Sequence, residues 1–152
     1  MARPKKNTVD YFPHDCHPNK ELEIFINKHG NEGYAFFYRL REVLGITKGH
    51  GYCADEKVDM AYLCKKTGVD EKLLIEMVEF LCEIGEINKK IWRDNYFIWW
   101  PNFVDSLKEL YKRRKNDLPN YEKLTLFRKE LKVKVFESYQ ENKFLQNDVS
   151  PT

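Results

Sequence analysis

Lysine and arginine side chains cluster at two places in this chain, and both clusters have the chemistry to bind phosphate. Arginine forms paired hydrogen bonds with phosphate oxygens, and lysine meets them as a point charge. The second cluster also suits the C-terminus of a helix, where the helix dipole favours positive charge. We expect both clusters to contact the phosphate backbone of DNA. They comprise Arg3, Lys5 and Lys6 near the N-terminus, and Lys112, Arg113, Arg114 and Lys115 further along.

Histidine and cysteine residues raise a second possibility, a tetrahedral zinc site with two ligands of each type. Short coincidences of such residues also arise by chance. In the alternative interpretation, which we favour, Asp15 caps a helix and His14 holds the N-terminal segment on the core. We therefore expect no metal and no other cofactor. The candidate ligands are His14, Cys16, His17, His50 and Cys53.

No catalytic motif accompanies these residues. The sequence has no glycine-rich loop for phosphates, no GxSxG and no HExxH. Charged residues make up 33%, the mean hydropathy is -0.68, and no run of 18 apolar residues occurs. We predict a cytoplasmic, non-enzymatic protein with no membrane partner, and we expect its cysteines to be free thiols.

The elements that must position the cations are mostly helical. Apolar residues at three- and four-residue steps predict helices near residues 19–29, 31–45, 56–66 and 70–84, and another from about residue 103. Residues rich in aromatic and β-branched types predict a hairpin with strands at 87–92 and 96–99. The fold class predicted is mainly α with a small β hairpin: a winged helix-turn-helix with extra N-terminal helices and a C-terminal helix.

The predicted hairpin carries a third cationic group, Lys89, Lys90 and Arg93. Wing residues of this kind commonly touch the DNA backbone, while exposed hairpins also carry charge for solubility. Both roles stay open. We include the three residues among the DNA-binding candidates.

The second helix of the helix-turn-helix is acidic, which argues against its reading of DNA bases. Each carboxylate facing the DNA lowers affinity for a polyanion. We expect this helix to serve protein contacts or solvation, and the basic segments to hold DNA. Its acids are Asp70, Glu71, Glu76, Glu79, Glu83 and Glu86, with Lys72 as the one lysine among them.

Three motifs in this order resemble one known family. They are DYFPHD (residues 10–15), GNEGYAFFYRLREVLG (30–45) and WPNFVDSLKELYKRRKNDLP (100–119). They resemble the N-terminal winged-helix domain of phage and prophage replication-initiation proteins, relatives of replisome organisers and DnaD-like proteins. The resemblance covers residues 1–119 and implies a role in starting replication. The residues after 119 are too few for the DnaD-like domain that relatives often carry there.

Two parts of the chain follow from these patterns. Residues 1–119 are predicted to form the winged-helix domain, and residues 120–152 a partly helical C-terminal extension with a frayed end. The function expected is DNA binding in replication initiation, with replisome proteins and a second copy of the chain as candidate partners. Two alternatives stay open: a protein-interaction scaffold without DNA binding, and a transcription regulator.

Overall fold

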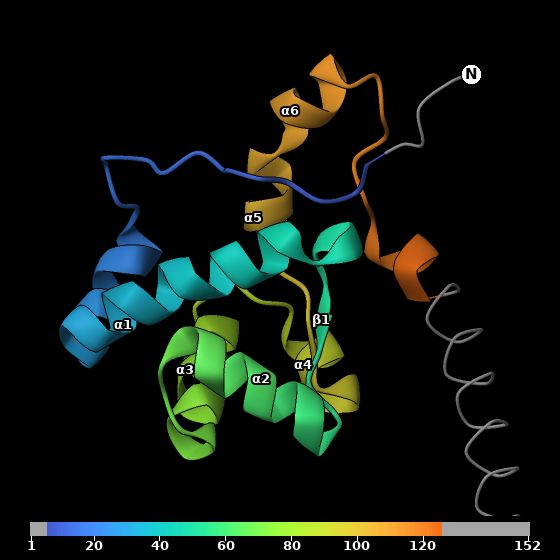
Figure 1. Cartoon of the computed structure of the whole chain (residues 1–152). Helices are drawn as coiled ribbons and strands as arrows, with labels where there is room; N and C mark the ends of the chain where they lie inside the picture. The colour runs from blue at the N-terminus through green and yellow to red at the C-terminus, as the bar shows by residue number, and fades with distance from the viewer. Residues whose placement is uncertain (1–5, 126–152) are drawn as a thin grey trace, which may run out of the picture. The chain divides into compact units, whose positions relative to one another are not determined.

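A computed structural model describes residues 6–125 of the chain, which divides into two compact units, Met1–Pro119 and Asn120–Thr152. The fold is mainly helical with one small antiparallel sheet, which confirms the predicted fold class (Figure 1). Within the described residues, no helix has both the length and the apolar character needed to cross a membrane. The elements of the first unit are α1 (Lys20–Ile46), η1 (Lys48–His50), β1 (Tyr52–Cys53), α2 (Lys57–Thr67), α3 (Glu71–Glu83), α4 (Lys89–Asn95), β2 (Phe97–Ile98), α5 (Pro101–Ser106) and α6 (Lys108–Arg113).

Helix α1 crosses the molecule, with α2 and α3 on one side and α5 and α6 on the other (Figure 1). It begins at Asn19, whose side-chain oxygen accepts a hydrogen bond from the Leu22 N–H at 2.9 Å. Gly30 interrupts it with a φ of 65°, so α1 consists of two helical segments, as the sequence predicted. The longer second segment presents the central part of the core.

The helix-turn-helix is confirmed as α2 and α3. Gly68 ends α2 in the left-handed conformation (φ 76°), which glycine adopts without steric cost. Asp70 then caps α3 by accepting a hydrogen bond from the Leu73 N–H at 2.8 Å. The sequence therefore determined both helices and the turn between them through local chemistry.

The predicted wing hairpin is wrong in its first strand and in its pairing, whereas β2 lies within the predicted second strand at residues 96–99. Residues 87–92 were expected to be a strand, but α4 begins at Lys89 because Asn88 caps it, accepting from the Ile91 N–H at 3.0 Å. The expected turn at residues 93–95 is the end of this helix. Strand β2 pairs instead with β1, with Tyr52 opposite Ile98 and Cys53 opposite Phe97. The sheet thus joins segments on either side of the helix-turn-helix.

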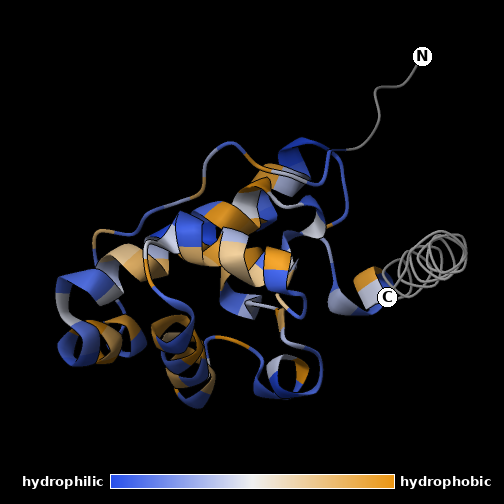
Figure 2. Cartoon of the chain, turned by 60° about the horizontal axis from the view of Figure 1, so that its bottom comes forward, coloured by the Kyte–Doolittle hydropathy of each residue, from blue (hydrophilic) through white to orange (hydrophobic). Residues whose placement is uncertain are grey.

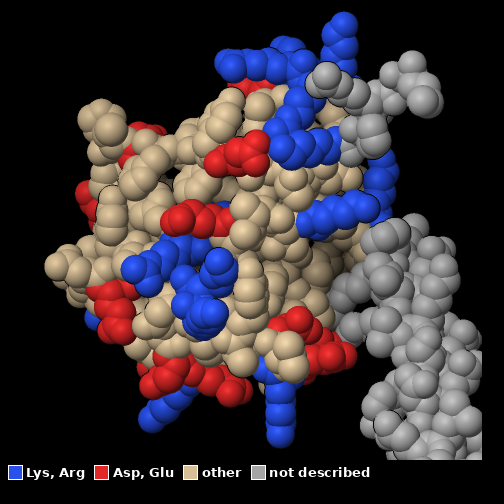
Figure 3. All heavy atoms as spheres, viewed as in Figure 1, with Lys and Arg blue, Asp and Glu red and all other residues tan. Residues whose placement is uncertain are grey.

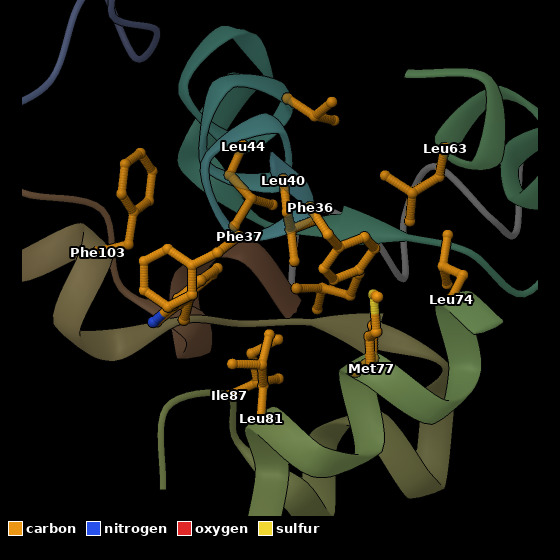
Figure 4. Packing of buried hydrophobic residues seen from close by; sticks show 14 of the residues in the cluster. Phe36, Phe37, Leu40, Leu44, Leu63, Leu74, Met77, Leu81, Ile87 and Phe103 are labelled. Atoms are coloured by element: carbon orange, nitrogen blue, oxygen red, sulfur yellow. The ribbon is translucent and has the colours of Figure 1, made fainter. Parts of the chain in front are cut away.

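Hydrophobic residues from nearly every element meet in one core, while hydrophilic residues cover the helices outside (Figure 2). The side chains of α1 point toward those of α2 and α3 (Figure 4). Burial of this apolar surface is the main contribution to folding stability. The labelled core residues are Phe36, Phe37, Leu40, Leu44, Leu63, Leu74, Met77, Leu81, Ile87 and Phe103.

One carboxylate of the acidic helix region is buried, contrary to the expectation that Glu86 lies on an exposed face. Glu86 is 1% exposed and accepts a hydrogen bond from the Trp100 indole N–H at 2.8 Å. It also accepts from the side-chain amides of Asn102 at 3.3 Å and Asn19 at 3.5 Å. Glu86 therefore joins the starts of α1 and α5 to the segment after α3.

The second unit is described only for residues 120–125. Asn120 accepts a hydrogen bond from the Lys123 N–H at 2.9 Å, and residues 121–125 are helical. The remainder of the predicted C-terminal extension, residues 126–152, lies outside the described residues.

Candidate nucleic-acid interface

The basic cluster at residues 112–115 spans the end of α6 and the turn after it. The Asn116 N–H donates to the Tyr111 carbonyl at 3.0 Å, and the Lys115 N–H donates to that of Lys112 at 3.1 Å. Lys115, which lies directly before Asn116, adopts the left-handed conformation with a φ of 54°. This hydrogen-bond pattern closes a helix C-terminus. It places the four cations where the helix dipole favours positive charge.

The N-terminal segment lies directly against this helix end. Arg114 donates from Nη1 to the Thr8 carbonyl at 2.8 Å and to the Lys6 carbonyl at 3.4 Å. Asn116 donates from Nδ2 to the Lys6 carbonyl at 3.2 Å and to Asn7 Oδ1 at 3.3 Å. The structure therefore brings together the described parts of the two basic clusters. Arg114 and Asn116 thus act as tethers, meaning that their side chains hold the N-terminal segment in place. No pattern in the sequence predicts this role.

Two backbone hydrogen bonds fix the same segment to the rest of the fold. The Val9 N–H donates to the Gly45 carbonyl at 2.8 Å, and the Gly49 N–H donates to the Asn7 carbonyl at 3.0 Å. A Cβ at Gly45 would lie 3.2 Å from Val9 Cγ2, so the missing side chain allows this close approach. The extended segment is thus part of the folded surface from Lys6 onward.

A buried histidine supports α6 from beneath. His50 is fully buried, with Nδ1 2.9 Å from the Leu44 carbonyl and Nε2 within hydrogen-bond distance of the Tyr111 hydroxyl. A carbonyl only accepts, so Nδ1 carries the proton and Nε2 of the neutral ring accepts from Tyr111. Burial lowers the pKa of His50, outweighing the hydrogen bond to Leu44; the nearby Arg114 charge lowers it further. The neutral ring therefore connects α6 to the core.

The exposed charge at this end of the molecule is predominantly positive. Lys112, Arg113 and Lys115 are exposed, whereas Arg114 is half-buried. Lysine and arginine side chains gather in the upper part of the face in Figure 3, where α6 lies. Lys6 forms an exposed ion pair with Asp10 at 3.1 Å, which contributes at most about 1 kcal/mol. Arg3 and Lys5 lie outside the described residues.

The three predicted wing cations do not join this surface. Lys89, Lys90 and Arg93 lie on α4, whose position in Figure 1 is at the opposite end of the unit from α6. They are exposed, but they belong to a helix and not to a hairpin. These three cations therefore form a separate group from those at the end of α6.

The outer face of α3 is acidic, as the sequence predicted apart from Glu86. Its first carboxylate, Asp70, is engaged in capping the helix. An acidic surface repels DNA, so α3 is unsuited to the major groove. The exposed acids on and before α3 are Asp70, Glu71, Glu76, Glu79 and Glu83.

The candidate zinc ligands have separate roles. His14 stacks on Tyr38, with 3.9 Å between ring centroids and 13° between the ring planes, so it holds the N-terminal segment against α1 as predicted. The predicted helix cap at Asp15 is wrong, because its carboxylate accepts from the His17 N–H at 2.9 Å and Asn19 caps α1 instead. Cys53 donates from Sγ to Asp55 at 2.8 Å. Among residues 6–125, no three His, Cys, Asp or Glu side chains group as metal ligands. The cysteines are free thiols.

No protein-family model, curated protein or solved structure matches this chain.

Proposed function

We propose that this protein binds DNA through backbone phosphates at the surface formed by α6 and the N-terminal segment. The supporting observation is the pair of hydrogen bonds from Arg114 to the Thr8 and Lys6 carbonyls. They place Lys6 beside the exposed cations of Lys112, Arg113 and Lys115. Arg3 and Lys5 extend this charge along the chain. Lys89, Lys90 and Arg93 form a secondary cationic surface on α4 that a longer DNA reaches.

Phosphate contact agrees better with the charge distribution than base reading does. The exposed face of α3 carries carboxylates, and a base-reading helix has to enter the groove of a polyanion. Contacts limited to phosphates fix the protein on DNA without selecting a sequence. This argues against the alternative of a sequence-specific transcription regulator.

The biological role that goes with this binding is replication initiation in a phage or mobile element, in the cytoplasm and without catalysis. The resemblance of residues 1–119 to the N-terminal domain of such initiation proteins is the ground for this part of the proposal. Replisome proteins and a second copy of the chain are the partners that it entails. The acidic face of α3 is a surface for such contacts.

The second candidate function is a protein-interaction scaffold without DNA binding. Helix α2 favours it, because Val58 is 78% exposed and Tyr62 is 44% exposed on its outer side. Exposed apolar side chains close together are typical of protein contacts. Size measurement by light scattering separates the candidates: oligomerisation without DNA retention supports the scaffold.

The main experiment is a fluorescence-anisotropy titration with labelled duplex DNA at several salt concentrations. Each phosphate contact contributes a slope of roughly -0.9 to the plot of log K against log salt. Four cations, from Lys6, Lys112, Arg113 and Lys115, therefore give a slope of about -3 to -4 with little dependence on sequence. No binding at low salt would rule out the proposal.

A matched pair of charge reversals locates the surface. Arg113→Glu changes an exposed cation of α6, and Lys72→Glu makes the same change in charge on α3. We expect Arg113→Glu to weaken duplex binding at least tenfold. It should also make the plot of log K against log salt less steep, by the equivalent of about one to two phosphate contacts. The second should have a smaller effect, through net charge alone. Equal effects would place the DNA elsewhere.

A further inference from the structure

A groove of about 580 Å³ lies between the extended N-terminal segment and the second half of α1. Its apolar floor includes Val9 and Val43, which are 2% and 3% exposed. Aromatic and charged side chains form its walls and rim. A volume of this size is sufficient for a small ligand or a short stretch of a polymer. The helix-turn-helix contributes to the rim only through Lys66 at the end of α2.

Two flat aromatic surfaces line this groove. The first is the ring of Tyr11, which is 68% exposed, so most of its surface is not used in packing against the core. The rings of His14 and Tyr38 stack with 3.9 Å between centroids, and the Tyr34 hydroxyl lies 3.2 Å from His14 Nε2. Each surface offers a π face on which a nucleobase stacks regardless of its identity.

Cations stand on the rim beside these rings. Arg39 and Lys66 both line the groove, and a Cβ placed on Gly68 would lie 2.7 Å from Arg39 Nη1. Arg39 therefore lies over the turn between α2 and α3, at the same end of α2 as Lys66. Figure 3 shows a group of lysine and arginine side chains near the centre of the face where α1 crosses.

Two carboxylates, Asp10 and Glu42, also line the groove. Asp10 is ion-paired with Lys6 at 3.1 Å, so its charge is offset within the N-terminal segment. The Lys6 carbonyl in turn accepts a hydrogen bond from Arg114. The N-terminal segment therefore contributes residues to the groove and is also held by Arg114 at the end of α6.

We propose that this groove binds single-stranded nucleic acid, with bases on Tyr11 and on the His14–Tyr38 stack and phosphates at Arg39 and Lys66. Aromatic platforms combined with a cationic track are the means by which proteins bind single strands without reading sequence. A base in an intact duplex is stacked between its neighbours and is not available to these rings. This inference rests on the proposed function and adds to it a preference for single-stranded over duplex nucleic acid.

The test compares a labelled oligothymidylate of about 15 nucleotides with a duplex and an oligouridylate of equal length, each titrated with the full chain. Tyr11→Ala should weaken binding of both single strands about 5- to 150-fold and leave duplex binding within about twofold, because it removes one stacking platform. The two single strands distinguish DNA from RNA as the ligand.

Two further variants make the result specific. Tyr11→Phe keeps the ring and should retain single-strand binding. Tyr96→Ala removes another exposed tyrosine, 49% exposed and outside the groove lining, and should leave all three affinities unchanged. Circular dichroism of each variant checks that the fold persists, which the exposure of Tyr11 leads us to expect.

The outcomes separate the inference from the proposed function. If Arg113→Glu weakens duplex binding while Tyr11→Ala leaves single-strand binding unchanged, the function stands and the groove is excluded. If single-strand binding depends on Tyr11 while the protein ignores duplex DNA, the groove stands and the duplex-binding surface is excluded. Equal losses for single and double strands, or no binding to any of the three, overturn the inference.

Discussion

Arg114 donates a hydrogen bond to the carbonyl oxygen of Thr8 over 2.8 Å, joining residues that are 106 positions apart in the chain. This contact turns two basic segments into neighbours. The neighbouring arginines of the cluster also have different roles. Arg114 is half-buried and holds the N-terminal segment, whereas Arg113 is exposed to solvent.

Removing the tether should cost stability and release the N-terminal segment. Arg114→Ala loses charge-assisted hydrogen bonds to the Thr8 and Lys6 carbonyls, and we expect the free energy of unfolding to fall by about 1–2 kcal/mol. Urea unfolding measures the loss, and limited proteolysis should cleave after Lys6 more rapidly. Arg113→Ala is the control and should change stability by less than about 0.5 kcal/mol. Equal losses in the two variants would contradict the tether.

Stability should decline as the pH falls below neutrality because His50 is buried and neutral. Burial lowers the pKa of His50 below its ordinary value of 6.5, so the unfolded chain binds a proton at a higher pH than the folded one. His50 therefore contributes full stability above about pH 6.5, and this contribution is lost as the pH falls toward the folded pKa. The slope from one such group is at most about 1.4 kcal/mol per pH unit.

Chemical denaturation at a series of pH values from about 7.5 to about 5 measures this dependence, because the range begins above the ordinary histidine pKa of about 6.5 and extends below it. His50→Gln should flatten the curve. Burial also lowers the pKa of His29. His29→Gln therefore measures how much of the dependence of unfolding free energy on pH comes from His29. A curve unchanged by His50→Gln would mean that His50 is not buried in its neutral form.

The buried Glu86 carboxylate should be sensitive to loss of its charge. Arg41 lies over the Trp100 ring, 4.6 Å from its centroid; burial lowers the pKa of Arg41, and the Glu86 charge opposes that shift. Glu86→Gln leaves this buried guanidinium less compensated, because it removes the negative charge, and it replaces one of the two acceptor oxygens that Trp100, Asn102 and Asn19 share by an NH2 group. We expect a loss of about 1–3 kcal/mol in urea unfolding.

Glu83→Gln is the matched control for Glu86→Gln because Glu83 is an exposed acid at the end of α3. It should change the free energy of unfolding by less than about 0.5 kcal/mol. A similarly small effect at Glu86 would show that its carboxylate charge has no part in the stability of the fold.

Lys115 should show opposite effects on folding and on DNA binding. Its φ of 54° costs a side-chain-bearing residue about 1–2 kcal/mol relative to glycine. Lys115→Gly relieves this strain, but glycine also has greater conformational freedom in the unfolded chain, which opposes folding. The free energy of unfolding should therefore rise by about 0.5–1 kcal/mol. The same change removes one phosphate contact and should reduce the salt slope by about 0.9.

Lys115→Ala separates the two effects. It removes the same charge but retains the strained conformation, so DNA binding should weaken as in Lys115→Gly without a rise in the midpoint of thermal unfolding. A gain in stability for the alanine variant equal to that for glycine would contradict the conformational explanation.

The sequence by itself determined the features that rest on local interactions. Asn19 and Asp70 accept hydrogen bonds from N–H groups three residues ahead, and Gly68 adopts a left-handed turn, so these helix boundaries were predictable. The fold class and the helix-turn-helix followed from them. The cationic clusters were equally visible, because charge is a property of the residue type.

Only the tertiary structure decided the features that depend on distant partners. Residues 87–92 have the composition of a strand, but β2 found its partner in β1, and the Asn88 cap started a helix in their place. Glu86 was expected to be exposed and is buried by partners from α1 and α5. The meeting of Lys6 with α6 depends on hydrogen bonds to backbone carbonyls, which every residue has and no sequence pattern marks.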